Sequence, residues 1–196
     1  MTGKIFFIMG ISGAGKGNLI TNLKNTKDSK FIFPLSYRSR PIRETEKNGV
    51  DSWFVTKEQF EDSIKAGEFL EYKKHYGLEH YYGTKYADVI ENGINKGKIV
   101  IKEIDMGGLL ILKNEKPELN NSYKTIFLTV PFEVQEARIK KRGVFMSKEE
   151  LEKRKLTAIE EIKNAKIHCD YMIDTSDKSK EEVLKKVLDF INSYSN

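Results

Sequence analysis

The residues best suited to do chemistry form a glycine-rich segment near the N-terminus, Gly10-Ile11-Ser12-Gly13-Ala14-Gly15-Lys16. Its spacing fits G-x-x-x-x-G-K, in which small residues let successive backbone N–H groups converge on phosphate oxygens beside a helix N-terminus. Lys16 then reaches the outer phosphates. The full pattern ends in Ser or Thr, whose hydroxyl binds magnesium, whereas Gly17 and Asn18 follow Lys16 here. The segment predicts a nucleotide phosphate site without the usual hydroxyl.

A second set of candidate residues is basic and falls into two clusters. Arg38, Arg40 and Arg43 share one polar stretch, and further lysines and arginines gather between residues 138 and 155. The planar guanidinium group donates paired hydrogen bonds to phosphate oxygens. Two clusters suit two phosphorylated ligands, whereas a duplex-binding surface more often carries one continuous basic stripe. We therefore expect no nucleic-acid partner, despite a net charge of +5.

Composition restricts the class of protein. The chain has 196 residues, 39% of them hydrophobic and 32% charged, which suits one compact α/β domain. No apolar stretch approaches the roughly 20 residues of a membrane span, so we expect no membrane partner. The single cysteine, Cys169, excludes an internal disulfide and favours a reducing cytoplasm. The sequence leaves open whether the protein is a monomer or a homodimer.

Strands and helices alternate along the chain. The apolar run from Lys4 to Met9 predicts a buried strand directly before the glycine-rich segment, and further strands are expected over 69–73, 98–105, 123–130 and 171–173. Capping boxes that begin at Thr56, Ser147 and Ser179 predict helix starts. Helical spacing also covers residues 84–95, with Gly97 as the stop. The alternation predicts an α/β fold with a parallel sheet and an insertion over about 36–95.

The stretch from Ser36 to Phe54 resembles guanylate kinases, which are P-loop nucleoside monophosphate kinases. The family pattern there runs roughly S-x-T-T-R-x-P-R-x-G-E-x-x-G-x-x-Y-x-F, and the matching residues are Ser36, Arg40, Arg43, Glu46, Gly49 and Phe54. The resemblance continues in order along nearly the whole chain, through Phe69-Leu70-Glu71, Tyr81-Tyr82-Gly83-Thr84, Glu103-Ile104-Asp105, Arg138-Ile139, Arg142-Gly143 and Lys153-Arg154.

The resemblance implies a fold and an activity. It implies one domain over 1–196, with a three-layer P-loop core (1–35, 98–137 and 158–196), a GMP-binding subdomain (36–97) and a helical lid (138–157). The implied reaction transfers the γ-phosphoryl group of ATP to GMP, and also to dGMP, giving ADP and GDP in purine nucleotide metabolism. Magnesium is expected to be held mainly by ATP phosphates and water, without a dedicated protein site.

The resemblance also implies roles for particular residues. The expected catalytic residues are Lys16, Arg40, Arg138, Arg142 and Arg154. The expected ATP site is Gly10, Ile11, Ser12, Gly13, Ala14, Gly15, Lys16, Gly17 and Asn18. The expected GMP site is Ser36, Arg40, Arg43, Glu46, Glu71, Tyr82, Thr84, Glu103 and Asp105.

The chain departs from the family pattern in four segments, one of which contains both Pro41 and Thr45. Ser52 replaces a phosphate-binding tyrosine, Pro41 sits one place early and Thr45 replaces a glycine. The stretch from Glu71 to Tyr82 is two residues longer than usual, and the phosphate loop lacks its hydroxyl. Two alternatives therefore stay open: a kinase of the same fold for another acceptor such as ribose 1,5-bisphosphate, or a catalytically inactive interaction module.

Overall fold

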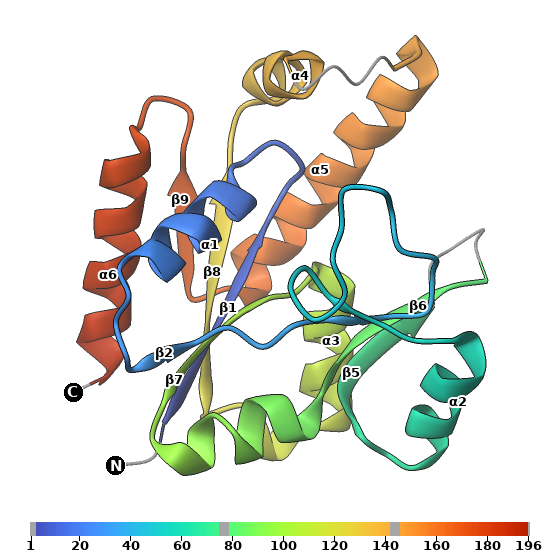
Figure 1. Cartoon of the computed structure of the whole chain (residues 1–196). Coiled ribbons are helices and arrows are strands. Elements are labelled where there is room, and N and C mark those ends of the chain that lie inside the picture. The colour runs from blue at the N-terminus through green and yellow to red at the C-terminus, as the bar shows by residue number, and fades with distance from the viewer. Residues whose placement is uncertain (1–2, 75–78, 142–145, 196) are drawn as a thin grey trace. The chain divides into compact units, whose positions relative to one another are not determined.

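The structure is a computed structural model that describes residues 3–74, 79–141 and 146–195 (Figure 1). One sheet has five strands in the order β2-β7-β1-β8-β9, and the pairs β2–β7 and β8–β9 are parallel. Its strands are β1 (Lys4–Gly10), β2 (Phe31–Ile32), β7 (Ile99–Glu103), β8 (Tyr123–Thr129) and β9 (Tyr171–Asp174). The α/β fold with a parallel sheet, predicted from the sequence, is confirmed.

Contacts within the chain divide it into two compact units. The first unit consists of Met1–Ile5, Ser29–Lys102 and Gly107–Tyr123. The second unit consists of Phe6–Asp28, Glu103–Met106 and Lys124–Asn196. The phosphate loop therefore belongs to the second unit, and the segment with Arg38, Arg40 and Arg43 belongs to the first.

The first unit is built around a four-stranded sheet in the order β4-β3-β6-β5. Its elements are β3 (Tyr37–Arg38), β4 (Trp53–Phe54), α2 (Lys57–Lys65), β5 (Phe69–Lys74) and β6 (Tyr81–Lys85). Strand β6 is antiparallel to both β3 and β5, and α2 lies beside the β5–β6 pair (Figure 1). Phe60 of α2 stacks between Phe69 and Tyr81, with ring centroids 4.3 and 5.3 Å away. This aromatic stack anchors the helix to the sheet.

The helix predicted over residues 84–95 is wrong in extent and type. Strand β6 continues through Lys85, and the helical part is a π-helical turn η1 (Ala87–Glu91) followed by a 3-10 turn η2 (Ile94–Lys96). Gly93 separates the two turns, and a Cβ there would lie 2.3 Å from both the Val89 carbonyl and the Val100 side chain. Gly93 itself has φ −108° and ψ −85°, so the backbone leaves helical geometry between the two turns. The remaining elements after β7 are α3 (Met106–Glu115) and the 3-10 turn η3 (Pro117–Leu119).

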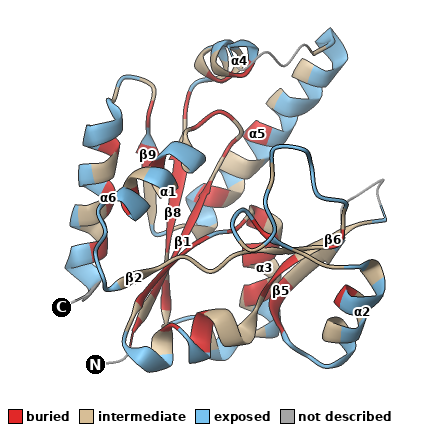
Figure 2. Ribbon diagram, viewed as in Figure 1, coloured by how far each residue is buried: buried red, intermediate tan, exposed pale blue. Residues whose placement is uncertain are grey.

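The second unit places helices around β1, β8 and β9. These helices are α1 (Lys16–Asn25), α4 (Phe132–Lys140), α5 (Lys148–His168) and α6 (Lys180–Ser195). Figure 2 shows β1 and β8 as almost continuously buried strands, and α1 lies next to α6 (Figure 1). Phe190 of α6 stacks on Tyr171 with ring centroids 4.7 Å apart and meets Phe6 edge-on. No helix in the described part of the chain is long and apolar enough to cross a membrane.

Candidate functional site

The phosphate loop connects β1 to α1, and its shape is set by glycine backbones. Gly10, Gly13 and Gly15 have φ values of 150°, 81° and 99°, a region that L side chains rarely adopt. A Cβ on Gly10 would lie 2.3 Å from the Leu128 carbonyl oxygen. Gly15 is the N-cap of α1, and no side chain caps the helix there. The uncapped N-terminus of α1 is therefore available to an anion.

Lys16 folds back over the loop that it follows. Its Nζ donates to the carbonyl oxygens of Gly10 at 2.6 Å and Ile11 at 3.2 Å. These two hydrogen bonds hold the ammonium group against the backbone of the loop. Gly17 and Asn18 follow as exposed residues of α1, and a Cβ on Gly17 would meet nothing within 4 Å.

Two arginines from the predicted lid contact the phosphate loop. Arg138 of α4 donates to the Gly13 carbonyl at 3.3 Å, and to the carbonyl and hydroxyl oxygens of Thr175 at 2.8 and 3.1 Å. Arg154 of α5 donates to the Ser12 hydroxyl at 3.3 Å. Arg142 lies outside the described residues. Helix α5 runs through His168, so the predicted end of the lid at residue 157 falls within a continuous helix.

Thr175 is a residue that the sequence analysis missed. It follows β9, is buried, and its hydroxyl donates to the Ala14 carbonyl at 2.9 Å while it accepts from Arg138. A single side chain therefore joins the phosphate loop to the lid arginine. A cavity of about 420 Å³ adjoins this junction, lined by residues that include Gly13, Asn18 and Val183. Its volume is in the range of small-molecule sites.

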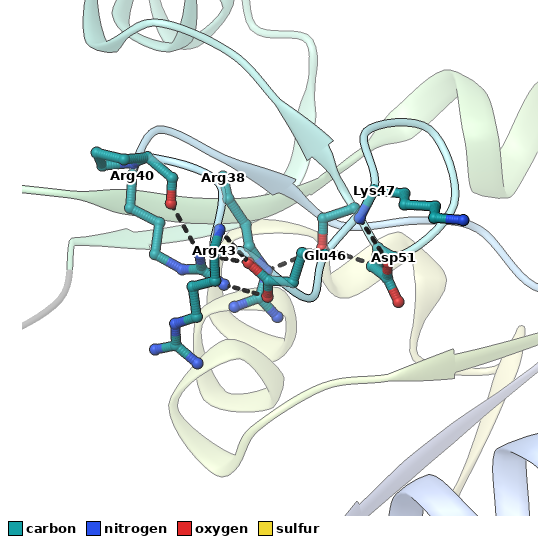
Figure 3. A network of polar contacts seen from close by, with 8 residues as sticks. Arg38, Arg40, Arg43, Glu46, Lys47 and Asp51 are labelled. Atoms are coloured by element: carbon teal, nitrogen blue, oxygen red, sulfur yellow. Dashed lines mark hydrogen bonds and ion pairs between the residues drawn. The ribbon is translucent and has the colours of Figure 1, made fainter.

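The arginine loop of the first unit (residues 38–52) is held by hydrogen bonds of side chains, whereas glycine backbones set the shape of the phosphate loop (Figure 3). Arg40 donates to both carboxylate oxygens of Glu46, at 2.7 and 2.5 Å, and the backbone N–H of Arg43 donates to the same carboxylate at 3.0 Å. The hydrogen bonds from Arg40 are the main reason that the pKa of Glu46 is lowered to about 2. Figure 3 shows the Arg43 guanidinium group turned away from Glu46. Glu46 thus orients Arg40 and leaves the Arg43 side chain at the surface.

Arg38 contacts the residue that replaces the family tyrosine. Its Nε donates to the hydroxyl oxygen of Ser52 at 2.9 Å, and the Ser52 hydroxyl donates to the Asp51 carbonyl at 2.7 Å. Ser52 is buried, with 2% of its surface exposed. A small side chain at position 52 therefore leaves room for an arginine from β3. The sequence analysis noted Arg38 in a basic cluster but did not include it in the site.

Glu71 and Thr84 form a buried pair within the same sheet. They lie opposite each other on β5 and β6, and the Thr84 hydroxyl donates to Glu71 Oε1 at 2.6 Å. Both are at least 95% buried. Tyr82 lies on β6 and pairs with Arg38 of β3. Ser36 directly precedes β3, and its hydroxyl oxygen accepts from Lys102 at 2.6 Å.

Glu103 and Asp105 belong to the second unit, with the phosphate loop. Glu103 is exposed and Asp105 is half-buried. Ile104 between them donates through its backbone N–H to the Ile8 carbonyl at 3.2 Å, which holds this turn beside β1. Among the described residues, no group of three or more His, Cys, Asp and Glu side chains could hold a metal ion.

A glycine-rich loop between the first strand and the first helix of a parallel α/β sheet is typical of the P-loop kinase fold. The sequence profile described as guanylate kinase matches residues 2–194. The chain therefore belongs to the guanylate kinase family.

Individual relatives agree with the profile. The chain is 42% identical to a guanylate kinase of Clostridium tetani over 145 residues, which cover 72% of this chain and 64% of the relative. It is 36% identical to the Mesoplasma florum protein over 96% of this chain and 60% of the relative, and 34% identical to the Mycoplasmopsis pulmonis protein over 94% and 93%. The chain thus spans less than two thirds of the first two relatives.

A solved structure shares the fold. The crystal structure of guanylate kinase from Anaplasma phagocytophilum matches with a TM-score of 0.73 and 21% sequence identity, over 99% of this chain and 87% of that chain. At this identity the match shows the architecture alone.

Proposed function

We propose that this protein transfers the γ-phosphoryl group of ATP to GMP and dGMP, releasing ADP and GDP, in cytoplasmic purine nucleotide metabolism. The buried Glu71–Thr84 pair carries the proposal. Thr84 donates to one oxygen of the carboxylate, and a carboxylate has about four acceptor positions on its two oxygens, so it can accept from several N–H groups. Guanine presents N1–H and N2–H donors along one edge, whereas adenine presents a bare N1 and no N2 amine. A buried acceptor therefore discriminates between the two bases.

In this proposal the residues that bind the acceptor phosphate come from the arginine loop and the neighbouring strand β6. Arg40, Arg43 and Tyr82 bind the monophosphate, and Glu46 keeps the Arg40 fork in a fixed orientation through two hydrogen bonds. We add Arg38 to this group, because its contact with Ser52 puts a cation on the strand beside Tyr82. An arginine in this position replaces the phosphate contact of the family tyrosine.

In this proposal the residues that bind ATP belong to the second unit. The loop from Gly10 to Asn18 binds the phosphates through backbone N–H groups, and Lys16 neutralises the outer ones. Arg138, Arg142 and Arg154 stabilise the charge that spreads over the transferred group. Phosphoryl transfer between nucleotides needs no strong general base, so positioning and water exclusion supply most of the rate.

A bound Mg²⁺ would supply positive charge that neutralises the phosphates. The phosphate loop offers no hydroxyl after Lys16 to hold it. Glu103 and Asp105 lie in the same unit as the loop and fit the ion as carboxylates that accept hydrogen bonds from its waters, because Mg²⁺ keeps several waters in protein sites.

A panel of acceptors tests the proposal. ADP formation is measured with MgATP and each of GMP, dGMP, AMP, UMP, CMP and ribose 1,5-bisphosphate. Turnover confined to GMP and dGMP supports the proposal. Turnover with ribose 1,5-bisphosphate instead refutes the assigned acceptor, and nucleotide binding without any turnover points to an inactive interaction module.

A further inference from the structure

A buried lysine lies beside the proposed base site and has no role in the function described so far. Lys102 is on β7, and only 4% of its surface is exposed. Its Nζ donates to the hydroxyl oxygen of Ser36 at 2.6 Å and to the carbonyl oxygen of Pro34 at 3.2 Å. Lysine is almost never fully buried in proteins unless it is paired. Its position therefore calls for a specific role.

The chemistry of the ammonium group fixes the direction of the Ser36 hydrogen bond. An ammonium has three donors and no acceptor, so the Ser36 oxygen must accept from Lys102. The single hydroxyl hydrogen of Ser36 then points to another group. The Ser36 backbone is held as well, because its carbonyl accepts from the Trp53 N–H at 2.9 Å. Ser36 is only half-buried, so its hydroxyl acts as a preset donor at an accessible position.

One carboxyl group on a neighbouring element, Asp88, interacts electrostatically with Lys102. Burial raises the pKa of the Asp88 carboxyl on η1, and the hydrogen bond from Tyr37 and the charges of Lys85 and Lys102 oppose that rise. Tyr37 donates to Asp88, and burial followed by Asp88 raises the pKa of Tyr37 to about 12. The charge of Lys85 lowers the pKa of Asp88, and the charge of Glu68 raises the pKa of Tyr37. The two acceptors within reach of the Lys102 Nζ, the Ser36 hydroxyl oxygen and the Pro34 carbonyl oxygen, fix the ammonium group in place as a donor.

The sheet register brings Ser36 into line with the buried acceptor. Tyr37 pairs with Gly83 across the antiparallel β3–β6 ladder, so Ser36 lies opposite Thr84. Thr84 in turn lies opposite Glu71 on β5. Residues that lie directly opposite share one face of a sheet. Ser36, Thr84 and Glu71 therefore form one row, about 10 Å long over two interstrand spacings, with a donor at one end and an acceptor at the other.

We propose that Lys102 is a positioning residue for base specificity, which holds Ser36 as a hydrogen-bond donor to the carbonyl oxygen at position 6 of the purine. Glu71 at the other end of the row accepts from the N1–H and N2–H groups. Adenine offers an amine at position 6, which a preset donor repels. The inference rests on the proposed function, because it assigns this row of side chains to the acceptor base.

Analogues that change one edge of the base at a time test the inference. 6-Thio-GMP keeps both N–H donors but replaces the oxygen at position 6 by a weaker acceptor, and IMP keeps the oxygen but lacks the N2 amine. We expect the wild type to favour GMP over 6-thio-GMP by about tenfold in kcat/KM, the value of one neutral hydrogen bond. The variants are Lys102→Met, Ser36→Ala and the double variant.

The expected result is a loss of discrimination at position 6 alone. Lys102→Met and Ser36→Ala each reduce the GMP to 6-thio-GMP ratio to about twofold, and the double variant falls no further, because both changes remove the same contact. The GMP to IMP ratio stays at the wild-type value in all three, which a general loss of folded protein would not produce. An unchanged ratio in Lys102→Met, or additive losses, overturns the inference.

Two further readouts separate the possible failures. If the wild type does not phosphorylate GMP, the proposed function fails before any variant is compared. If it does and Lys102→Met keeps the ratio, only the present inference fails. Should Lys102→Met fold poorly, a crystal structure of the wild type with GMP decides. The Ser36 hydroxyl oxygen is expected within about 3.2 Å of both Lys102 Nζ and the base oxygen, and a hydroxyl turned away from the base overturns the inference.

Discussion

The phosphate loop and the arginine loop both contain cationic side chains, but they are built differently. Glycine backbones with positive φ shape the phosphate loop, and a lysine six residues from Gly10 folds back onto its carbonyl. The arginine loop is shaped by side chains, through the bidentate Arg40–Glu46 pair and the Arg38–Ser52 contact (Figure 3).

This difference affects how each loop tolerates change. A backbone cradle needs glycine at fixed positions, because a Cβ either strains φ or meets a carbonyl. A side-chain scaffold can exchange partners, provided that another residue fills the space and supplies the charge. The tyrosine-to-serine replacement at position 52, with Arg38 on its hydroxyl, is such an exchange.

The strongest test of the phosphate loop removes its lysine. Lys16→Ala is expected to lower kcat by about 100- to 1,000-fold, since a single preorganised charge at a developing anion contributes this much. The fold should persist, because the glycine backbone remains. ADP formation and the thermal midpoint are measured together, with Lys186→Ala on the exposed side of α6 as the control. Turnover at the wild-type level in Lys16→Ala would contradict the assignment of this loop.

A second test asks whether Arg38 compensates for the missing tyrosine. Arg38→Met is expected to raise KM for GMP about tenfold, the effect of losing one hydrogen bond to a charged group. KM for ATP should stay unchanged. Steady-state kinetics with each substrate varied separately give both values. Ser52→Ala serves as the matched variant and should raise KM for GMP less, because it removes only the group that orients Arg38. If KM for GMP is unaltered in Arg38→Met, Arg38 does not bind the acceptor phosphate, and the proposal keeps only Arg40 and Arg43 for that role.

The ion pair of the arginine loop makes a prediction about pH. The pKa of Glu46 is about 2 in the folded protein, below an ordinary value of about 4.3. The contribution of Glu46 to stability is therefore complete above about pH 4.3 and is lost as the pH falls through about 2. Arg40→Met should return the pKa of Glu46 toward its ordinary value, as followed by carbon NMR of the side-chain carboxyl group. A pKa that stays near 2 without Arg40 would mean that the backbone of Arg43 holds the carboxylate alone.

The smallest expected effect is on the free energy of unfolding, when either of two glycines with open space around it is replaced by alanine. A Cβ on Gly15 or on Gly17 would meet nothing within 4 Å, but only Gly15 has a positive φ, of 99°. Gly17→Ala is expected to stabilise the protein by about 0.5–1 kcal/mol, as alanine does in a helix. Gly15→Ala should destabilise it by about 1–2 kcal/mol through strain alone. Urea unfolding gives both values, and changes of the same sign would show that φ does not govern this loop.

The sequence was sufficient wherever structure depends on nearby residues. The capping boxes at Thr56, Ser147 and Ser179 correctly predicted the starts of α2, α5 and α6, because a cap joins residues three apart. The glycine spacing likewise predicted the strand, loop and helix around Lys16. Over residues 84–95 the apolar spacing was misleading, because Thr84 and Lys85 pair with β5, and pairing with a separate strand does not show in the local pattern.

By itself, the sequence determined the phosphate loop, the helix starts, the α/β class and, through ordered motifs, the family. Only the tertiary structure decided which side chains work together. Arg38 meets Ser52 from fourteen residues away, Lys102 meets Ser36 from 66 away and Thr175 meets Ala14 from 161 away. Local geometry is limited by the two dihedral angles of each residue, so a pattern can predict it. Contacts between distant residues depend on strand order and register, which the spacing of residues along the chain does not specify.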